Sequence, residues 1–336
     1  MKRKRSRLPA PSKRPSHSPR IVTLQRLSDR LGVGLDELNE WAERGDDGYS
    51  RFISHKGTKP RDIDNPLHRL KDIQRLINER LLRSMLTFPK HVRGGVRGQH
   101  IGRVGSVHVG KKYVVVVDVR KLYPSIHYER VLHFWTHDAE CSPKVGRLLT
   151  RLTTCRSSLP TGAPTSLHIA NLILSPIDQR IVGFCQERHL SYTRWVDDIV
   201  VSGDASPGMI ESFVTDVLRE HKLRVSGDKV RRLSITGDAE ALIFKKIDVS
   251  QPRPRAASQY ASDVLSETRE AIGAIERLGH CDETEAICRR VLSRIGFIRL
   301  IQGRTSVRLR KAHAELRALR RTKKAEAKAA HPAGPH

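Results

Sequence analysis

Two short stretches decide the fold of this 336-residue chain: VVVVDVRKLYPSI, from Val114 to Ile126, and RWVDDIVVSG, from Arg194 to Gly203. Both are rich in the β-branched residues that favour buried strands, and both carry aspartate beside the apolar run. The chain has 62 Lys and Arg residues against 36 Asp and Glu residues, so carboxylates among apolar strand residues are distinctive here. Asp118 and the pair Asp197 and Asp198 are therefore candidate metal ligands.

The formal net charge of +26 indicates a polyanionic partner, because Lys and Arg residues that neutralise phosphates release condensed counterions. No stretch approaches the roughly 18 apolar residues of a membrane span, and the N-terminus lacks the apolar core of a signal peptide. We therefore expect a soluble, cytoplasmic protein that handles nucleic acid and has no membrane partner. The five cysteines form no C-x-x-C pair, which favours reduced, buried thiols over a zinc site or disulfides.

The hydrophobic pattern predicts an α+β protein, in which a sheet with packed helices precedes a region of helices alone. Residues 1–20 hold eight basic and no acidic residues and predict a disordered arm, followed by a helical cap over residues 21–48. Residues 52–66 are turn-rich, and the glycine-rich residues 91–110 predict a loop. The periodicity predicts helices over 67–81, 147–153, 167–187, 207–220 and 259–319, a strand over 113–117, a turn over 159–166, a hairpin over 192–202, and short strands around Leu223 and Leu242.

The aspartates suit nucleotidyl transfer, which uses two divalent ions about 3.5–4 Å apart. Magnesium prefers oxygen ligands, and an aspartate at a strand end beside a hairpin with two more would supply them. Taken singly, each motif is more often a turn or a helix cap. Their occurrence in order, together with other motifs, favours catalysis.

Three segments resemble motifs A, B and C of reverse transcriptases in order and spacing: DVRKLYPSI, LPTGAPTSLHIANLILSPID and RWVDDIVVSG. The similarity is strongest to the prokaryotic retron-like and defence-associated branches. HKGTKPRDIDNPLHRLKDIQ resembles the fingers segment of these enzymes, and HKLRVSGDKVRRLS resembles motif D. The resemblance covers roughly residues 49–303. It implies a right-hand polymerase with fingers (49–110), palm (111–250) and helical thumb (251–303), followed by a basic helical tail and a disordered C-terminus (304–336).

The resemblance implies the catalytic residues. Asp118 and Asp197 match the metal-binding aspartates, with Asp198 and the carbonyl group of Val119 as further ligands of two Mg²⁺ ions, or of Mn²⁺. Lys229 matches the motif D lysine, which would protonate the pyrophosphate leaving group. Arg231 or Arg232 could share its electrostatic part.

The resemblance also implies a nucleotide-binding set: Lys56, Arg61, Arg120, Tyr123, Thr161 and Gly162. Tyr123 would act as a steric gate that repels a ribose 2′-hydroxyl, and its alternative is a core tyrosine. Gly162 would let the backbone approach the incoming nucleotide. Arg61 would grip the triphosphate together with Lys56, for which Lys59 is an alternative.

The nucleic-acid contacts are expected from Trp195, where the family usually has tyrosine, and from the basic tail residues Arg304, Arg308, Arg310 and Lys311. Residues 303–328 contain ten basic and two acidic residues, so the tail would contact phosphates rather than bases. The alternative is a solubilising tail.

The expected function is RNA-directed DNA synthesis from a 3′-hydroxyl with dNTPs, on a structured non-coding RNA template and in antiphage defence. The retron Asn-Ala-x-x-His signature is reduced to VGSVH, with only His108 retained, and the retron Val-Thr-Gly triplet is missing from residues 239–249. These departures favour a branch other than the retron enzymes. The alternatives are a retron enzyme that synthesises msDNA, an RNA-directed RNA polymerase, and a catalytically degenerate RNA-binding protein. A protein partner or an oligomer stays open.

Overall fold

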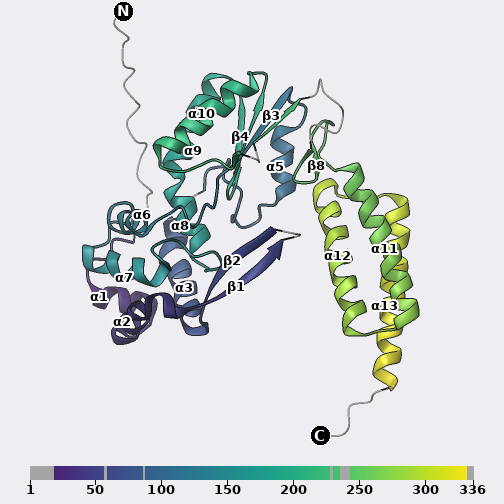
Figure 1. The fold of residues 1–336 in the computed structure, drawn as a ribbon, viewed down its shortest axis with the longest axis horizontal. Helices are drawn as coiled ribbons and strands as arrows, with labels where there is room; N and C mark the ends of the chain where they lie inside the picture. Colours follow the sequence, from purple (N-terminus) through teal and green to yellow (C-terminus); the bar gives the residue numbers. More distant parts are fainter. Residues whose placement is uncertain (1–18, 57–58, 86–87, 228–229, 235–242, 331–336) are drawn as a thin grey trace, which may run out of the picture. The chain divides into compact units, whose positions relative to one another are not determined.

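The computed structural model describes residues 19–56, 59–85, 88–227, 230–234 and 243–330 (Figure 1). Most of the predicted N-terminal arm, Lys229 and the end of the tail lie outside these residues. The chain divides into two compact units, each built from separate segments. Unit 1 comprises Met1–Arg97, Val117–Val200 and Gly208–Val230, and unit 2 comprises Gly98–Val116, Val201–Pro207 and Arg231–His336. The predicted palm segment thus contributes residues to both units, and the predicted domain boundaries stay a prediction.

The helical cap predicted over residues 21–48 is found in unit 1 as two helices. They are α1 (Leu24–Leu31) and α2 (Leu35–Arg44), followed by the short 3₁₀ helix η1 (Gly45–Gly48). The Thr23 hydroxyl caps α1 by accepting from the Arg26 amide, and Gly32 ends it in the left-handed conformation at φ 60°. Leu27, Leu31 and Leu38 are fully buried, so this cap is part of the core of unit 1.

The prediction of a turn-rich segment over residues 52–66 is wrong, because β1 (Tyr49–Lys56) and β2 (Lys59–Pro66) form a long antiparallel hairpin. Figure 1 shows the two strands side by side, and their register pairs Ser54 with Arg61. Phe52 is 49% exposed and Ile53 is 60% exposed, so cross-strand pairing rather than burial holds the strands together. A hairpin without a buried face lacks the alternation that identifies strands in a sequence.

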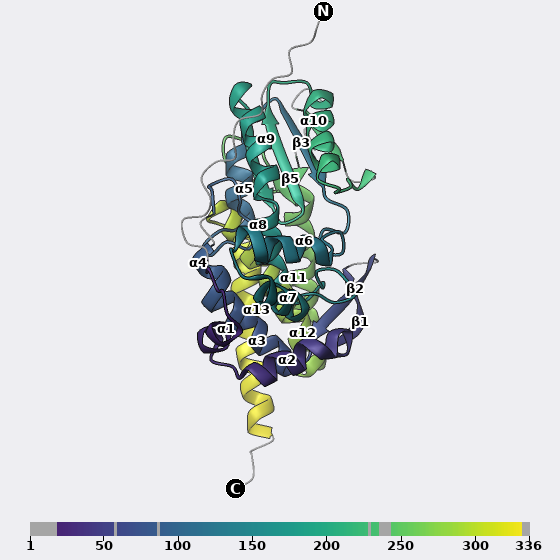
Figure 2. The ribbon, with the colours of Figure 1, turned by 90° about the vertical axis from the view of Figure 1, so that its left-hand side faces the viewer.

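The helix predicted over residues 67–81 is found as α3 (His68–Ile77), which continues into the π-helix η2 (Asn78–Leu82) and α4 (Arg83–Met85). The next helices of the unit are α6 (Tyr128–His133), the π-helix η3 (Phe134–Asp138), α7 (Pro143–Thr153) and α10 (Pro207–Glu220). The single helix predicted over 167–187 is two helices, α8 (Ser166–Ile173) and α9 (Ser175–Glu187). Pro176 has no N–H to continue α8, so the helix is interrupted there. Figure 2 shows α8 beside α9 and α6, with which it is in contact.

Four strands form the central sheet, in the order β4 (Ser191–Trp195), β5 (Asp198–Gly203), β3 (Tyr113–Asp118) and β6 (Arg231–Ser234). β3 pairs antiparallel with β6, with Tyr113 opposite Ser234. Val114 to Val117 and Ile199 to Val201 are at most 1% exposed, which explains why the central strands are continuous apolar runs. The strand predicted around Leu223 is wrong: Val225 forms only an isolated bridge with Val119. The strand around Leu242 falls outside the described residues until β7 begins at Ile243.

Unit 2 contains the predicted helical region as α11 (Ser258–Leu278), α12 (Asp282–Gln302) and α13 (Val307–Ala330). These helices share a core that includes Val264, Val291, Ile295 and Leu316. The small sheet of β7 (Ile243–Phe244), β8 (Ile247–Asp248) and β9 (Arg255–Ala256) precedes them.

The loop predicted over the glycine-rich residues 91–110 is wrong for its second half, which forms α5 (Ile101–His108). A Cβ atom on Gly102 would lie 3.2 Å from Cα of Ile301, and one on Gly105 would lie 3.0 Å from Cγ2 of Ile247. The glycines therefore allow α5 to pack closely against α12 and β8. In the sequence the same glycines indicated a loop.

The structure also bears on the membrane spans and the cysteines. Within the described ranges, no helix combines the length and the apolar character needed to cross a membrane. All five cysteines are free; Cys141, Cys155, Cys185 and Cys288 are buried as expected, whereas Cys281 is exposed, which corrects that prediction. Cys281 lies at the N-terminus of α12, outside the core of the helices.

Candidate active site

The end of β3 and the turn between β4 and β5 bring the predicted aspartates to the same edge of the sheet. Asp118 is the last residue of β3 and 9% exposed, and Asp198 is the first residue of β5 and 4% exposed. The amide of Val119 donates a hydrogen bond to the carbonyl oxygen of Asp197 over 2.9 Å. Asp118 with Val119 at the end of β3, and Asp197 with Asp198 at the start of β5, therefore lie together at one edge of the sheet.

The β4–β5 turn has an uncommon backbone, because Val196 adopts φ 59°. This left-handed region is rare for a β-branched residue. The residues before α5 pack tightly on the turn: a Cβ atom on Gly94 would lie only 2.3 Å from the amide nitrogen of Val196. The amides of Arg93 and Gly94 donate to the carbonyl oxygen of Arg194, and the Arg194 amide donates to that of His91. The segment from His91 to Gly94 thus holds the backbone at the start of the turn.

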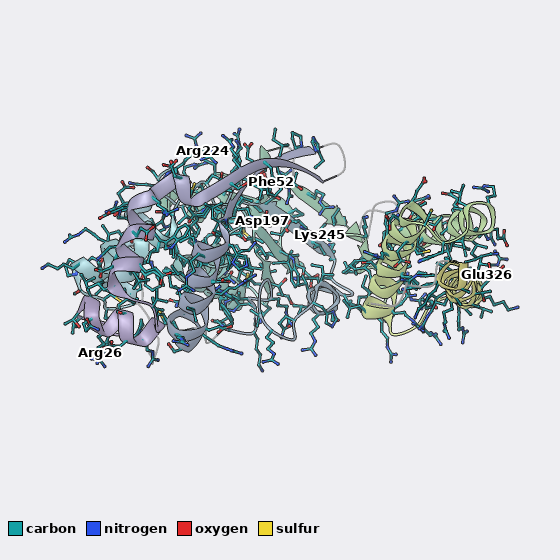
Figure 3. All side chains as sticks on the ribbon, turned by 90° about the horizontal axis from the view of Figure 1, so that it is seen from below. Arg26, Phe52, Asp197, Arg224, Lys245 and Glu326 are labelled. Carbon is teal, nitrogen blue, oxygen red and sulfur yellow. The ribbon has the colours of Figure 1, made fainter. Side chains whose placement is uncertain are left out.

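A third segment, Arg224 to Ser226 in the stretch that resembles motif D, lies beside β3. The amide of Arg120 donates to the carbonyl oxygen of Arg224 over 2.8 Å, and the Ser226 amide donates to that of Asp118 over 2.9 Å. The Ser226 hydroxyl also donates to Oδ1 of Asp118 over 2.7 Å. Figure 3 shows Arg224 at the outer edge of the unit and Asp197 further inside. Ser226 is therefore a further residue of the site, which orients the Asp118 carboxylate.

The donor set of this edge suits a hard divalent cation. Aspartate carboxylates and a backbone carbonyl are the oxygen ligands that Mg²⁺ and Mn²⁺ take. Among the described residues, no three or more His, Cys, Asp or Glu side chains are grouped as a metal site. Neighbouring carboxylates repel one another when no cation is bound, and a bound cation turns this repulsion into attraction to a shared positive charge. The residues therefore fit the implied ions as ligands from two strands, not as a preformed cage.

Tyr123 lies within electrostatic reach of Asp197. Burial raises the pKa of Tyr123 to about 12, and the negative charge of Asp197 contributes in the same direction. The phenol is therefore neutral throughout the physiological range. Its partial burial leaves both predicted roles open, the gate and the core tyrosine.

The predicted nucleotide loop meets the fingers hairpin. The amide of Asp64 on β2 donates to the carbonyl oxygen of Thr161 over 2.8 Å. Gly162 has φ 121°, and a Cβ atom there would lie 2.9 Å from Cγ2 of Ile63. Arg61 is exposed on the same strand. Only a residue without a side chain allows this close approach of the loop to β2.

The other residues predicted to bind the nucleotide or nucleic acid come from the ends of strands and from the basic tail. Trp195 ends β4 and is half-buried beside the turn, and Arg120 is exposed after β3. The backbone of Lys56 ends β1, while its side chain is outside the described set, as is Lys229. The basic tail residues belong to unit 2, where Arg304 precedes α13 and the others lie in its first turns: Arg308, Arg310 and Lys311.

A sheet that presents aspartates from two adjacent strands, together with a fingers hairpin and a group of long helices, defines a right-hand polymerase fold. Residues 53–265 match the family model described as reverse transcriptase (RNA-dependent DNA polymerase), so the chain belongs to this family. The predicted fold class and the predicted family are both confirmed.

Curated relatives have the same assignment in their names. The chain is 28% identical over 233 residues to the Retron Se72 reverse transcriptase of Salmonella heidelberg (strain 579083-10), which covers 65% of this chain and 61% of the relative. It is 27% identical over 248 residues to the Retron Ec48 reverse transcriptase of Escherichia coli, covering 69% and 61%. The chain thus spans about 61% of the length of these two relatives. Among solved structures, telomerase from Candida albicans aligns with a TM-score of 0.46 and 10% identity, over 84% of this chain and 61% of that one.

Proposed function

We propose that the protein is an RNA-directed DNA polymerase that extends a 3′-hydroxyl with dNTPs. The observation that carries the proposal is the hydrogen bond from Val119 to Asp197, which joins the two aspartate-bearing segments in a chain of the reverse transcriptase family. Asp118, Asp197 and Asp198 hold the metal ions, with the carbonyl group of Val119 as a further ligand. Mg²⁺ ions held there would lower the pKa of the attacking hydroxyl and stabilise the leaving pyrophosphate.

The chain's own residues bind and orient the nucleotide. The Ser226 hydroxyl fixes one oxygen of the Asp118 carboxylate, and the Tyr123 ring excludes a ribose 2′-hydroxyl. The Thr161–Gly162 backbone lies against the base pair that forms. Arg61 on β2, Lys56 at the end of β1 and Arg120 bind the triphosphate, and Lys229 donates the proton to the leaving group.

The template and the product are RNA and DNA, bound through their phosphates. Arg308, Arg310 and Lys311 are exposed on α13, and further along this helix Arg317, Arg320, Arg321 and Lys324 line a hollow of about 240 Å³. Arg and Lys side chains of this kind supply affinity without sequence choice. Trp195 contacts the primer terminus from the end of β4.

The curated relatives named above are retron enzymes, which supports the retron alternative over the other prokaryotic branches, in spite of the reduced VGSVH signature. The template is then a structured non-coding RNA and the product is msDNA, with a role in antiphage defence. Sequencing the nucleic acid that co-purifies with the protein tests this assignment. DNA covalently joined to one RNA species is the retron result, and a heterogeneous pool of host RNA contradicts it.

Primer extension on an RNA template tests the activity itself. We expect incorporation of dNTPs with Mg²⁺ by the wild type and none by Asp197→Asn. Asp204→Asn is the matched control, because Asp204 is an exposed aspartate just after β5. Preferred incorporation of rNTPs would favour an RNA-directed RNA polymerase, and a wild type that binds RNA without synthesis would favour the degenerate binding protein.

A further inference from the structure

Arg194 is a charged residue in the core, three positions before Asp197. Its side chain is 1% exposed and lies on β4. Nε and Nη2 donate to the two carboxylate oxygens of Asp178 over 2.8 and 2.7 Å. Nη1 donates to Oδ1 of Asn171 over 2.7 Å and to the carbonyl oxygen of Val196 over 3.1 Å. The guanidinium therefore connects α8, α9 and the turn that precedes the aspartates.

Other groups complete this network. The Tyr192 hydroxyl donates to Oδ1 of Asp178 over 2.5 Å, and Nδ2 of Asn171 donates to the carbonyl oxygen of Gly94 over 3.0 Å. Gly94 in turn donates its amide to the carbonyl oxygen of Arg194 over 3.4 Å. The side chains thus form a connected set that reaches the His91–Gly94 segment packed on the turn.

The charge of Arg194 is retained despite its burial. Burial disfavours the guanidinium charge, but the Asp178 carboxylate outweighs this effect and raises the pKa of Arg194. Burial also raises the pKa of Tyr192, with Asp178 contributing, so the phenol keeps its proton and donates. A buried ion pair is often replaceable by apolar residues without loss of stability. Stability alone therefore does not explain why the Arg194–Asp178 pair is buried here.

The backbone conformation of Val196 gives the buried pair a structural role. A β-branched residue at φ 59° is strained, and such strain persists only where the surroundings enforce it. The carbonyl group of Val196 belongs to the same peptide plane as the amide of Asp197. The hydrogen bond from Nη1 of Arg194 to this carbonyl oxygen fixes the orientation of that plane.

We propose that Arg194 is a positioning residue, which through the Val196 carbonyl holds the Val196–Asp197 peptide so that the Asp197 carboxylate faces Asp118 for metal binding. The inference rests on the proposed function, since it assigns a purpose to the aspartates. In this role Arg194 would contact neither the substrate nor the metal ion. It would fix the backbone geometry of Asp197, the residue that binds the metal.

The first experiment measures metal binding directly, by Mn²⁺ titration followed by electron paramagnetic resonance. Arg194→Met combined with Asp178→Leu replaces the ion pair by apolar side chains and removes the donor to Val196. We expect Mn²⁺ affinity to fall about 10-fold, the lower end of the range for residues that orient ligands. Tyr192→Phe removes a hydrogen bond of the same network but none to Val196, and it should bind Mn²⁺ as the wild type does. Equal affinity in the double variant and the wild type would overturn the proposal.

A rescue experiment covers the case in which the double variant does not fold. Arg194→Lys keeps the charge but loses the planar fork, so Mn²⁺ affinity and primer extension should both fall. Adding Val196→Gly removes the steric strain at φ 59°, and we expect it to restore part of both. A purely structural role of Arg194 predicts no such rescue. Leu149→Ala, a fully buried change on α7, controls for lost stability and should leave Mn²⁺ affinity unchanged.

The two hypotheses fail in different ways. If the wild type binds Mn²⁺ and the Arg194 variants bind it more weakly, but no DNA is made under any condition, the proposed function fails and the positioning role stands. If the wild type makes DNA and the Arg194 variants bind Mn²⁺ as it does, only the positioning role is overturned.

Discussion

The hydroxyl of Ser226 donates a hydrogen bond to Oδ1 of Asp118 over 2.7 Å, while the Ser226 amide donates to the Asp118 carbonyl oxygen over 2.9 Å. A hydrogen bond to one carboxylate oxygen leaves the other directed away from the serine. Groups in this relation to a ligand fix its orientation before the metal arrives. Ser226 therefore belongs to the candidate active site, although the resemblance to motif D assigns it no role.

Replacing Ser226 by alanine removes that hydroxyl and leaves the amide contact in place. We expect the Mg²⁺ concentration for half-maximal primer extension to rise about 10-fold, because the Asp118 carboxylate loses the side-chain hydrogen bond that orients it. Ser125→Ala is the matched control, since its hydroxyl donates to the carbonyl oxygen of Leu122 and to no carboxylate. An unchanged Mg²⁺ requirement in Ser226→Ala would show that the bond does not orient Asp118.

Tyr123 is expected to select the sugar. Tyr123→Ala should increase the ratio of rNTP to dNTP incorporation by at least about 10-fold, because a repulsion worth 1.4 kcal/mol gives that factor. Tyr123→Phe keeps the ring and should retain the selectivity of the wild type. The pKa of about 12 predicts that selectivity does not change between pH 6 and 9. A Tyr123→Ala enzyme with the selectivity of the wild type would identify Tyr123 as a core residue.

The aspartate-bearing strands could be predicted because their signal is local. Val114 to Val117 and Ile199 to Val201 are buried, so they form apolar runs that end at Asp118 or begin beside Asp198. Ser226 carries no such signal, because its importance arises from a contact across 108 positions of the chain. Arg194 could have been noticed, since an arginine within an apolar strand needs a buried partner, but the pattern does not identify Asp178 as that partner.

The fingers hairpin and α5 were missed for opposite reasons. β1 and β2 pair without a buried face, so Phe52 and Ile53 are exposed where alternation would put one of them inside. Gly102 and Gly105 lower the helix propensity of α5, yet they are what lets this helix approach Ile301 and Ile247. In both cases tertiary contacts decide a local structure that propensity alone assigns differently.

Gly162 should tolerate no side chain. Gly162→Ala combines strain at φ 121° with a Cβ atom 2.9 Å from Cγ2 of Ile63, so either the loop or β2 must move. We expect KM for dNTPs to rise about 10-fold, with a smaller change in kcat. Gly183→Ala on α9 meets no atom within 4 Å and should instead stabilise the protein by about 0.5–1 kcal/mol. A KM for dNTPs that is unchanged in Gly162→Ala would show that the loop is not part of the nucleotide site.

Glu285 should make the stability of the α11–α13 helices depend on acid pH. Side-chain hydrogen bonds from Arg320 lower the pKa of Glu285 to about 2, with Arg289 also contributing. Because the folded-state pKa lies below the ordinary value, the stabilisation is present above about pH 4.5 and is lost as the pH falls towards 2.

The Glu285→Gln variant tests this dependence by thermal unfolding. It should be less stable than the wild type at pH 7 by about 1 kcal/mol, a modest figure because Arg320 and Arg289 are partly exposed to water. The difference should shrink when the comparison is repeated at pH 4 and pH 2.5. Glu276→Gln, an exposed change on α11, should show little difference at any pH. A difference for Glu285→Gln that stays constant with pH would contradict the assigned cause.

The exposed basic residues of α13 should set the salt sensitivity of RNA binding. Changing Arg308, Arg310 and Lys311 together to glutamine removes up to three phosphate contacts, and each contact contributes about 0.7–0.9 to the slope of log K against log salt concentration. We therefore expect the slope to fall by about two and the affinity to fall equally for RNAs of different sequence. The control triple Arg26, Arg147 and Arg151→Gln changes exposed arginines of α1 and α7 and the net charge by the same amount. Equal slopes for the two triple variants would mean that total charge, not α13, determines binding, and the tail would then serve solubility alone.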